Sequence, residues 1–216
     1  MEITWYGHSC FRLTERAEAS VVCDPYDSQH VGYPALKLKA DIVTISHESP
    51  SHSYLKAVKG DPYVISGPGE FEIGGVFITG VRTNGRGKKE TTVSENTLYV
   101  IDYNGINIVH LGDLSVTPSQ SEVEELGPVH VALVPVGDGG GLNSAKAAEV
   151  ISLLEPNIVI PMHYSTQATK LKLDGINKFL KEMGLSHIET QPSLKITSIE
   201  GLPDETRVVV LDYPHE

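Results

Sequence analysis

Residues 41–53 read Asp41-Ile42-Val43-Thr44-Ile45-Ser46-His47-Glu48-Ser49-Pro50-Ser51-His52-Ser53. The apolar run 42–45 has the length and the β-branched composition of a buried strand, and the polar residues after it form a loop. In layered α/β proteins, loops that leave buried strands carry much of the chemistry. His47 and His52 suggest metal ligands, but Ser49 and Ser51 stand between them where metal-binding loops usually add further donors. The stretch therefore predicts a metal site from which some ligands are missing.

The composition limits the class of protein. The 216 residues carry 17 Lys and Arg against 28 Asp and Glu, which gives a net charge of −11. Such a chain repels phosphate, so neither non-specific nucleic-acid binding nor binding to an anionic membrane surface is expected. Length and the lack of a linker-like segment predict a single domain over residues 1–216. No 18-residue apolar run occurs and the first residues start a strand, which predicts a cytoplasmic protein.

Two features leave alternatives open. Cys10 and Cys23 form no CxxC pair, and we expect both to be core residues and not ligands or nucleophiles. Apolar faces on the last helix and on the C-terminal strands are explained equally by packing within the chain and by a homo-oligomer. We expect the partner of any site to be a small-molecule substrate or ligand, whose identity the sequence does not give.

Strand patterns dominate the first half of the chain, and strands alternate with helices in the second half. Asn104-Gly105 predicts a type I′ hairpin between strands 96–103 and 106–110. Thr117-Pro118 predicts the start of a helix that ends near residue 126, and Asn143 predicts the cap of the next helix. The pattern predicts an α/β protein with two sheets between helices, an αββα four-layer sandwich. Further strands are expected at 3–5, 10–13, 20–24, 42–45, 63–66, 76–81, 129–136, 158–161, 194–199 and 207–211, further helices at 52–58 and 174–183, loops at 26–39 and 82–95, and a turn-rich, non-helical segment with an emerging strand at 67–72.

Polar residues follow the apolar strands at several places. Each alone is explained by a hydrogen bond within a turn, but together they provide what a zinc site needs, since Zn²⁺ binds His nitrogen and Asp oxygen from different loops. These residues are His8, Asp24, His47 with His52, His110 with Asp113, and His163.

The order of these motifs resembles the metallo-β-lactamase superfamily, in its branch of small bacterial Zn-dependent hydrolase-like proteins. The resemblance covers about residues 1–166 and implies the αββα sandwich with a metal site at one edge. The motifs are Gly7-His8-Ser9-Cys10-Phe11, Cys23-Asp24-Pro25-Tyr26, Ser46-His47 through His52, Gly67-Pro68-Gly69-Glu70, His110-Leu111-Gly112-Asp113-Leu114, Val134-Pro135-Val136-Gly137 and Ile160-Pro161-Met162-His163-Tyr164.

The resemblance also implies a ligand set, which this chain fills only in part. The superfamily motif His-x-His-x-Asp-His matches His47 and His52 at its ends, with Ser49 and Ser51 in place of the second histidine and the aspartate. The bridging aspartate matches Asp113, and the final histidine matches His163. A further loop histidine is missing from residues 82–95, where the nearest equivalent is Gly85.

The ligands that this chain lacks are divided unequally between the two metal positions of the family. The first position keeps His47 as a weak ligand and should be empty, because serine hydroxyls are poor donors for Zn²⁺. The second keeps His52, Asp113 and His163, which predicts at most one ion, Zn²⁺ or else Mn or Fe, with a metal-free protein as the alternative. Asp113 would bind the ion and also orient or deprotonate the attacking water. For His8, Asp24 and His110, orienting the ligands and stabilising the loops are equally good explanations.

Two functions follow from the resemblance. The first is a metal-dependent hydrolase that acts on an ester, a lactone or a phosphodiester. The second is a non-catalytic member of the family that keeps the fold and binds a ligand or another protein. The missing ligands favour the second function, and the surviving His52, Asp113 and His163 favour the first.

Overall fold

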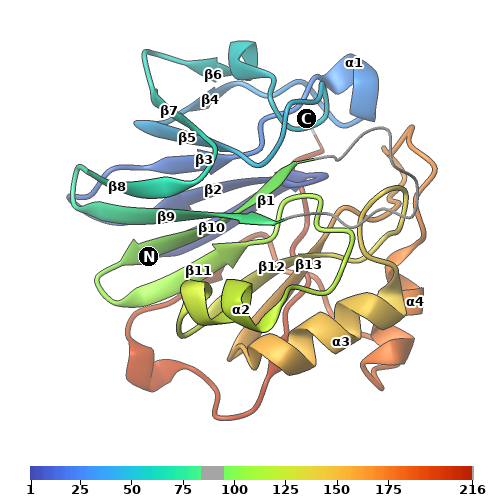
Figure 1. Ribbon diagram of the computed structural model, residues 1–216. Helices are drawn as coiled ribbons and strands as arrows, with labels where there is room; N and C mark the ends of the chain where they lie inside the picture. The colour runs from blue at the N-terminus through green and yellow to red at the C-terminus, as the bar shows by residue number, and fades with distance from the viewer. Residues whose placement is uncertain (84–94, 216) are drawn as a thin grey trace.

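Two β-sheets stack face to face in the computed structural model, which describes residues 1–83 and 95–215 (Figure 1). The first sheet has the strand order β14 (Leu194–Lys195), β1 (Glu2–Gly7), β2 (Cys10–Thr14), β3 (Val21–Cys23), β5 (Ile42–Ile45) and β7 (Tyr63–Ser66). The second has the order β15 (Arg207–Val208), β13 (Ile158–Met162), β12 (Val131–Pro135), β11 (Ile106–His110), β10 (Asn96–Tyr103), β9 (Val76–Thr83) and β8 (Gly69–Ile73). A small separate sheet pairs β4 (Leu38–Lys39) with β6 (Val58–Lys59).

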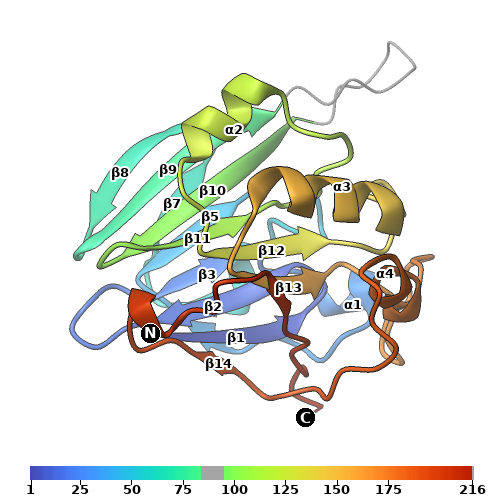
Figure 2. The same ribbon diagram turned by 90° about the horizontal axis from the view of Figure 1, so that it is seen from below.

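The helices lie on the outer faces of the two sheets. Figures 1 and 2 show α2 (Gln120–Leu126), α3 (Ser144–Leu154) and α4 (Ile176–Glu182) on the side of the second sheet, and Figure 1 shows α1 (Ser28–Val31) beyond the first sheet. Short 3₁₀ turns occur at Leu55–Ala57 and Ile199–Gly201. The predicted αββα sandwich is confirmed. Within the described part of the chain, no helix is long and apolar enough to cross a membrane.

The core fills the space between the sheets. Some strands alternate buried and partly exposed residues, and others are buried at every position. Along β1 the buried positions alternate with partly exposed ones, whereas every residue of β12 and β13 is buried, as expected for inner strands covered on both faces. Trp5 lies among aromatic side chains that include Phe11 and Tyr164, at ring-centroid distances of 6.5 and 5.2 Å. Cys10 and Cys23 are buried and unpaired, as predicted.

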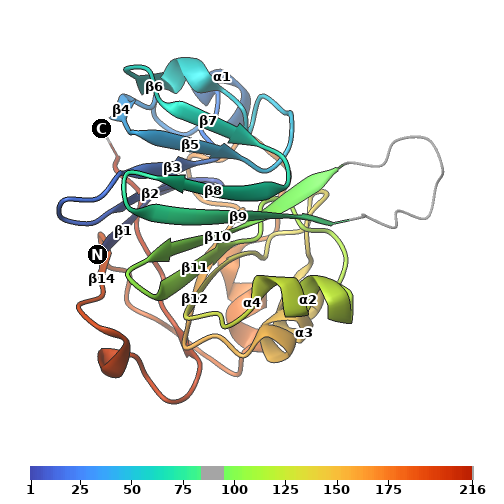
Figure 3. The same ribbon diagram turned by 60° about the vertical axis from the view of Figure 1, so that its left-hand side comes forward.

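Parallel pairing brings the chemically important loops to one edge of the sandwich. In the second sheet β11, β12 and β13 run parallel, and in the first sheet β3 runs parallel to β5. The carboxyl ends of parallel strands meet at one edge of a sheet, so the loops after β11, β12 and β13 leave the same edge, as do those after β3 and β5. Figure 3 shows the two sheets from the side of β7, β8 and β9.

Several expectations about local structure are confirmed. Asn104 and Gly105 join β10 to β11 with φ values of 52° and 85°, the backbone that a type I′ turn requires. Asn143 caps α3 by accepting a hydrogen bond from the Lys146 amide. The helix expected at 174–183 is α4, which is slightly shorter than predicted.

Other expectations were wrong. The second helix begins at Gln120 and not at Thr117-Pro118, because Ser119 and Glu122 form a reciprocal capping box. The loop expected at 26–39 contains α1, which Asp27 caps. The short helix expected at 52–58 is reduced to the 3₁₀ turn at Leu55–Ala57, and the last two strands are only two residues long. Residues 84–94 of the loop expected at 82–95 lie outside the described residues.

Candidate metal centre

Three buried histidines converge at the edge of the sandwich. His8 follows β1, His52 lies in the loop after β5, and His163 follows β13, so the site draws on both sheets. One ring nitrogen from each histidine lies within 4.8 Å of those of the other two. The three residues are 0%, 1% and 3% exposed. This is the number and type of donor that holds a Zn²⁺ ion in many proteins.

The backbone at two of these histidines has an uncommon conformation that hydrogen bonds hold in place. His8 and His163 both have positive φ, at 52° and 53°, a conformation that is uncommon for residues other than glycine. The His163 amide donates to the His8 carbonyl over 3.0 Å, and the Trp5 indole N–H donates to the same carbonyl over 3.0 Å. Gly7 is also required, since a Cβ there would lie 2.2 Å from the Tyr33 ring. These contacts fix the positions of two histidines relative to each other.

Several buried polar atoms at this site have no hydrogen-bond partner. They include both ring nitrogens of His8, Nδ1 of His163 and Oδ1 of Asp113. Buried polar side-chain atoms are paired in the great majority of cases, so a group of unpaired ones marks a place that is suited to an ion or a ligand. His52 differs, because its Nδ1 lies 2.8 Å from Ser51 Oγ and its Nε2 lies 3.1 Å from Ser9 Oγ.

Asp113 lies beside the three histidines but outside the group that they form. Its Oδ1 is 3.6 Å from His163 Nε2. The Asp113 amide donates to Asn96 Oδ1 over 2.9 Å, and Asn96 Nδ2 donates to the Leu111 carbonyl over 3.1 Å. On the other side, a Cβ on Gly141 would lie 2.6 Å from Asp113 Oδ1. Asn96 and Gly141 therefore restrict where the Asp113 carboxylate can lie.

His110 supports the loops around the site. Its Nε2 donates to the Ser9 carbonyl over 2.9 Å, and its Nδ1 accepts from the Gly112 amide at 3.1 Å. Both contacts suit a neutral ring with the proton on Nε2, and burial lowers the pKa of His110 to about 4. Because both nitrogens are occupied by the backbone, His110 stabilises loops, which is one of the two roles considered for it.

Asp24 has a similar supporting position. Its two oxygens accept from the Ser46 amide at 2.8 Å and from Ser46 Oγ at 2.6 Å, which fixes the residue next to His47. Burial raises the pKa of Asp24 to about 8, although the bonds from Ser46 work in the opposite direction. The Asp24 carboxyl therefore orients the start of the loop after β5 that carries His47 and His52.

Burial also determines the charge of the histidine group. It lowers the pKa of His8 and of His52 well below the ordinary value, and the neighbouring histidines lower both further. Burial lowers the pKa of His163 too, with the nearby Asp113 opposing the shift. Neutral imidazoles are the form that binds metal, so the site is ready for an ion at neutral pH.

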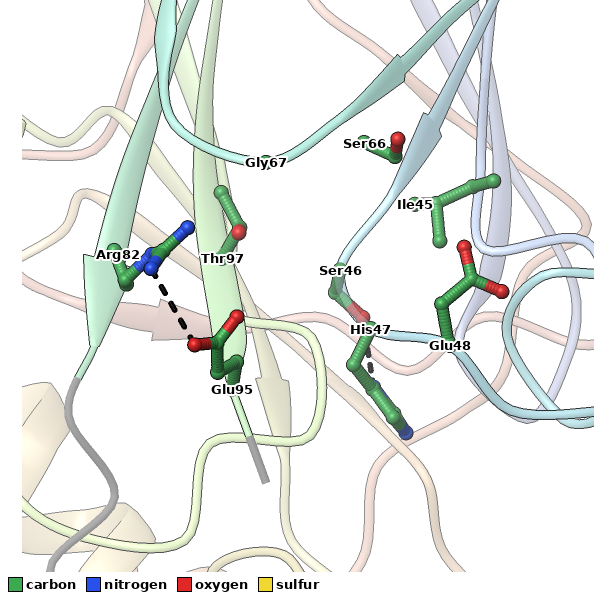
Figure 4. Close-up of a pocket in the computed structure, with 9 residues that line it drawn as sticks. All are labelled: Ile45, Ser46, His47, Glu48, Ser66, Gly67, Arg82, Glu95 and Thr97. Carbon is green, nitrogen blue, oxygen red and sulfur yellow. Dashed lines mark hydrogen bonds and ion pairs between the residues drawn. The ribbon is translucent and has the colours of Figure 1, made fainter. Parts of the chain in front are cut away.

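A pocket of about 490 Å³ opens next to this group (Figure 4). Figure 4 shows that strand ends from both sheets line it, with His47 in the loop that follows β5. His47 Nδ1 is 3.3 Å from Ser46 Oγ, and its ring centroid is 4.2 Å from that of His52. The lining residues are Ile45, Ser46, His47, Glu48, Ser66, Gly67, Arg82, Glu95 and Thr97, with Arg82 and Glu95 joined by an exposed ion pair of 3.4 Å.

The structure brings the predicted residues together in part. His52 and His163 lie in the three-histidine group, Asp113 is next to His163, and His47 lies between His52 and the pocket. That these residues bind metal stays a prediction. Sequence reasoning gave His8 only an orienting or loop-stabilising role, although its place after a strand was the available signal. It did not find Ser9 or Asn96, whose roles depend on distant parts of the chain.

Comparison with known proteins agrees with this architecture. The family model described as "Beta-lactamase superfamily domain" matches residues 2–163. The chain belongs to the metallo-β-lactamase superfamily. A solved superfamily structure from Thermotoga maritima, of a proposed Zn-dependent hydrolase, is 35% identical and has a TM-score of 0.80, with 99% of each chain covered.

Other members of the superfamily match over much of the chain. A UPF0173 protein of Pyrococcus furiosus is 29% identical over 188 residues, which cover 77% of this chain and 84% of that protein. A UPF0173 metal-dependent hydrolase of Methanosarcina mazei is 25% identical over 197 residues, with the same coverage of both chains.

Proposed function

We propose that this member of the superfamily is a metal-dependent hydrolase that holds one Zn²⁺ ion and cleaves an ester, a lactone or a phosphodiester. The observation that carries the proposal is the meeting of His52 and His163 with His8 at the edge of the sandwich, with Asp113 Oδ1 3.6 Å from His163 Nε2. The names of the UPF0173 relatives and of the Thermotoga maritima structure support the same class of activity.

The residues present fit a single ion. Imidazole nitrogen is a preferred ligand of Zn²⁺, and the unpaired His163 Nδ1 is available to it. Mn and Fe accept the same donors, so metal analysis decides between them. A second ion has no comparable support, because Ser49 Oγ and Ser51 Oγ lie 2.8 Å apart and hydrogen-bond to each other.

The chain's own residues suggest how the reaction proceeds. Bound Zn²⁺ would supply Lewis-acid chemistry for the carbonyl or phosphoryl oxygen and for the attacking water at neutral pH. Asp113 would accept a proton from the attacking water at Oδ1, which has no hydrogen-bond partner of its own. The pocket beside His47 holds the rest of the substrate, where Arg82 and the hydroxyls of Ser46 and Thr97 can bind its polar groups.

Metal analysis combined with a substrate panel tests this proposal. Protein purified without chelator should contain about one Zn, Mn or Fe per chain and should hydrolyse at least one chromogenic aryl ester, lactone or aryl phosphodiester. Asp113→Asn should lower the rate by at least about 100-fold, as expected for loss of a general base. A protein that stays metal-free in the presence of Zn²⁺ would contradict the proposal, and metal binding without turnover would favour the non-catalytic alternative.

A further inference from the structure

We propose that His8 is the third nitrogen ligand of the ion, in place of the carboxylate that the superfamily motif has at the position of Ser51. The inference rests on the proposed function, because it concerns the same metal site. It assigns a ligand from the turn between β1 and β2, which the match to the histidine motif does not predict. The ligand nitrogens then come from His8, His52 and His163.

Ser51 binds His52 and not the ion. Its Oγ lies 2.8 Å from His52 Nδ1 and 2.8 Å from Ser49 Oγ, so the hydroxyl already has two polar partners. When Ser51 Oγ accepts the Nδ1 proton of His52, the Nε2 lone pair faces the Ser9 hydroxyl at 3.1 Å, a neutral partner that a metal ion can replace. Ligand histidines usually have their second nitrogen held in this way. Ser51 therefore orients His52. The ligand that an aspartate at this position supplies in the superfamily motif must come from another residue of this chain.

His8 is in the right place to supply it. Its ring centroid lies 4.4 Å from that of His163 and 5.0 Å from that of His52, whereas His52 and His163 are 5.9 Å apart. The side chain is fully buried, and neither ring nitrogen has a hydrogen-bond partner. A structural histidine should look like His110, whose two nitrogens are both paired with the backbone. A metal ion provides the partner that His8 otherwise lacks.

The backbone holds His8 in this orientation. Its positive φ is maintained by the bonds from the Trp5 indole and the His163 amide to its carbonyl, which bind the turn after β1 to the end of β13. Positive φ in a residue other than glycine requires this kind of support from the surroundings. Three histidines with one open position form a known catalytic zinc arrangement, and that set leaves Asp113 free to accept a proton.

Metal titration of His8 variants tests the inference without using activity. Full-length protein is stripped with EDTA, dialysed and titrated with Zn²⁺ against a chromophoric competitor, and with Co²⁺ followed by its visible absorption. His8→Asn and His8→Asp are suitable, because Asn and Asp tolerate positive φ better than other residues. His110→Asn is the matched control, since His110 is equally buried but has no free nitrogen. Thermal unfolding with and without Zn²⁺ checks that each variant folds.

The expected result separates the variants. Wild type binds one ion, and His8→Asn binds at least 100-fold more weakly and loses the rise in Tm that Zn²⁺ gives the wild type. His8→Asp, which offers an oxygen ligand, recovers part of the affinity, and His110→Asn keeps the stoichiometry. If both His8 variants fold and bind Zn²⁺ as tightly as wild type while His163→Asn does not, His8 is not a ligand but the proposed function stands. If wild type binds neither metal, the proposed function and the inference both fail.

Discussion

Replacing Asn96 by alanine should loosen the turn that holds Asp113. The Asn96 side chain accepts from the Asp113 amide at 2.9 Å and donates to the Leu111 carbonyl at 3.1 Å, and the residue is 5% exposed. Asn96→Ala leaves the Asp113 amide without a partner, whereas the Leu111 carbonyl keeps the hydrogen bond that it accepts from the Leu114 amide at 3.2 Å. An unpaired amide that is poorly reached by water costs about 1–3 kcal/mol and the lost bond to the Leu111 carbonyl costs about 1 kcal/mol, so the free energy of unfolding should fall by about 2–4 kcal/mol. This is a large fraction of the roughly 5–15 kcal/mol that stabilises a typical domain.

Urea denaturation of the metal-free protein measures this loss, and Thr83→Val is the control. Thr83 Oγ1 donates to the Asn96 carbonyl over 3.0 Å, so this variant removes a buried hydrogen bond to the same residue without touching the Asp113 turn. Thr83→Val should cost about 1–2 kcal/mol and leave turnover unchanged, whereas Asn96→Ala should lower both stability and turnover. A change of less than about 0.5 kcal/mol in Asn96→Ala, the range of ordinary surface substitutions, would refute this account of the turn.

Three further outcomes are expected. Stability should fall as the pH drops from about 6.5 toward 4, because the folded protein keeps His110 neutral with a pKa of about 4 while the unfolded chain takes up the proton. His110→Asn should reduce this slope by about 1.4 kcal/mol per pH unit, and equal slopes in urea titrations would contradict the assignment. Gly141→Ala places a Cβ 2.6 Å from Asp113 Oδ1 and should lower turnover by about 100-fold. Gly175→Ala meets no atom within 4 Å and should keep wild-type turnover, so equal turnover of the two variants would argue against a constraint on Asp113. Stripping the metal with EDTA should lower Tm by about 5–10 °C relative to protein in Zn²⁺ at 100 times its Kd, as differential scanning fluorimetry can measure; an unchanged Tm would count against a bound ion.

Local patterns predicted much of the fold but only part of the site. The strand at 42–45 and the hairpin at Asn104-Gly105 were predictable because apolar runs and turn residues act over a few positions. The cap at Ser119 was missed because a threonine and a proline just before it gave a competing helix signal. The sequence could not predict that both ring nitrogens of His110 are hydrogen-bonded and that neither nitrogen of His8 is, since this depends on which loops of the two sheets face each other.

The hydrogen bond from the His163 amide to the His8 carbonyl joins the turn after β1 to the end of β13, more than 150 residues later in the sequence. The histidine group therefore exists only after both sheets have formed and docked, and contacts between such distant segments are slow to form because closing a long loop has a high entropy cost. An ion held by all three histidines would stabilise the folded state, so its uptake would report how much of a newly made population is native.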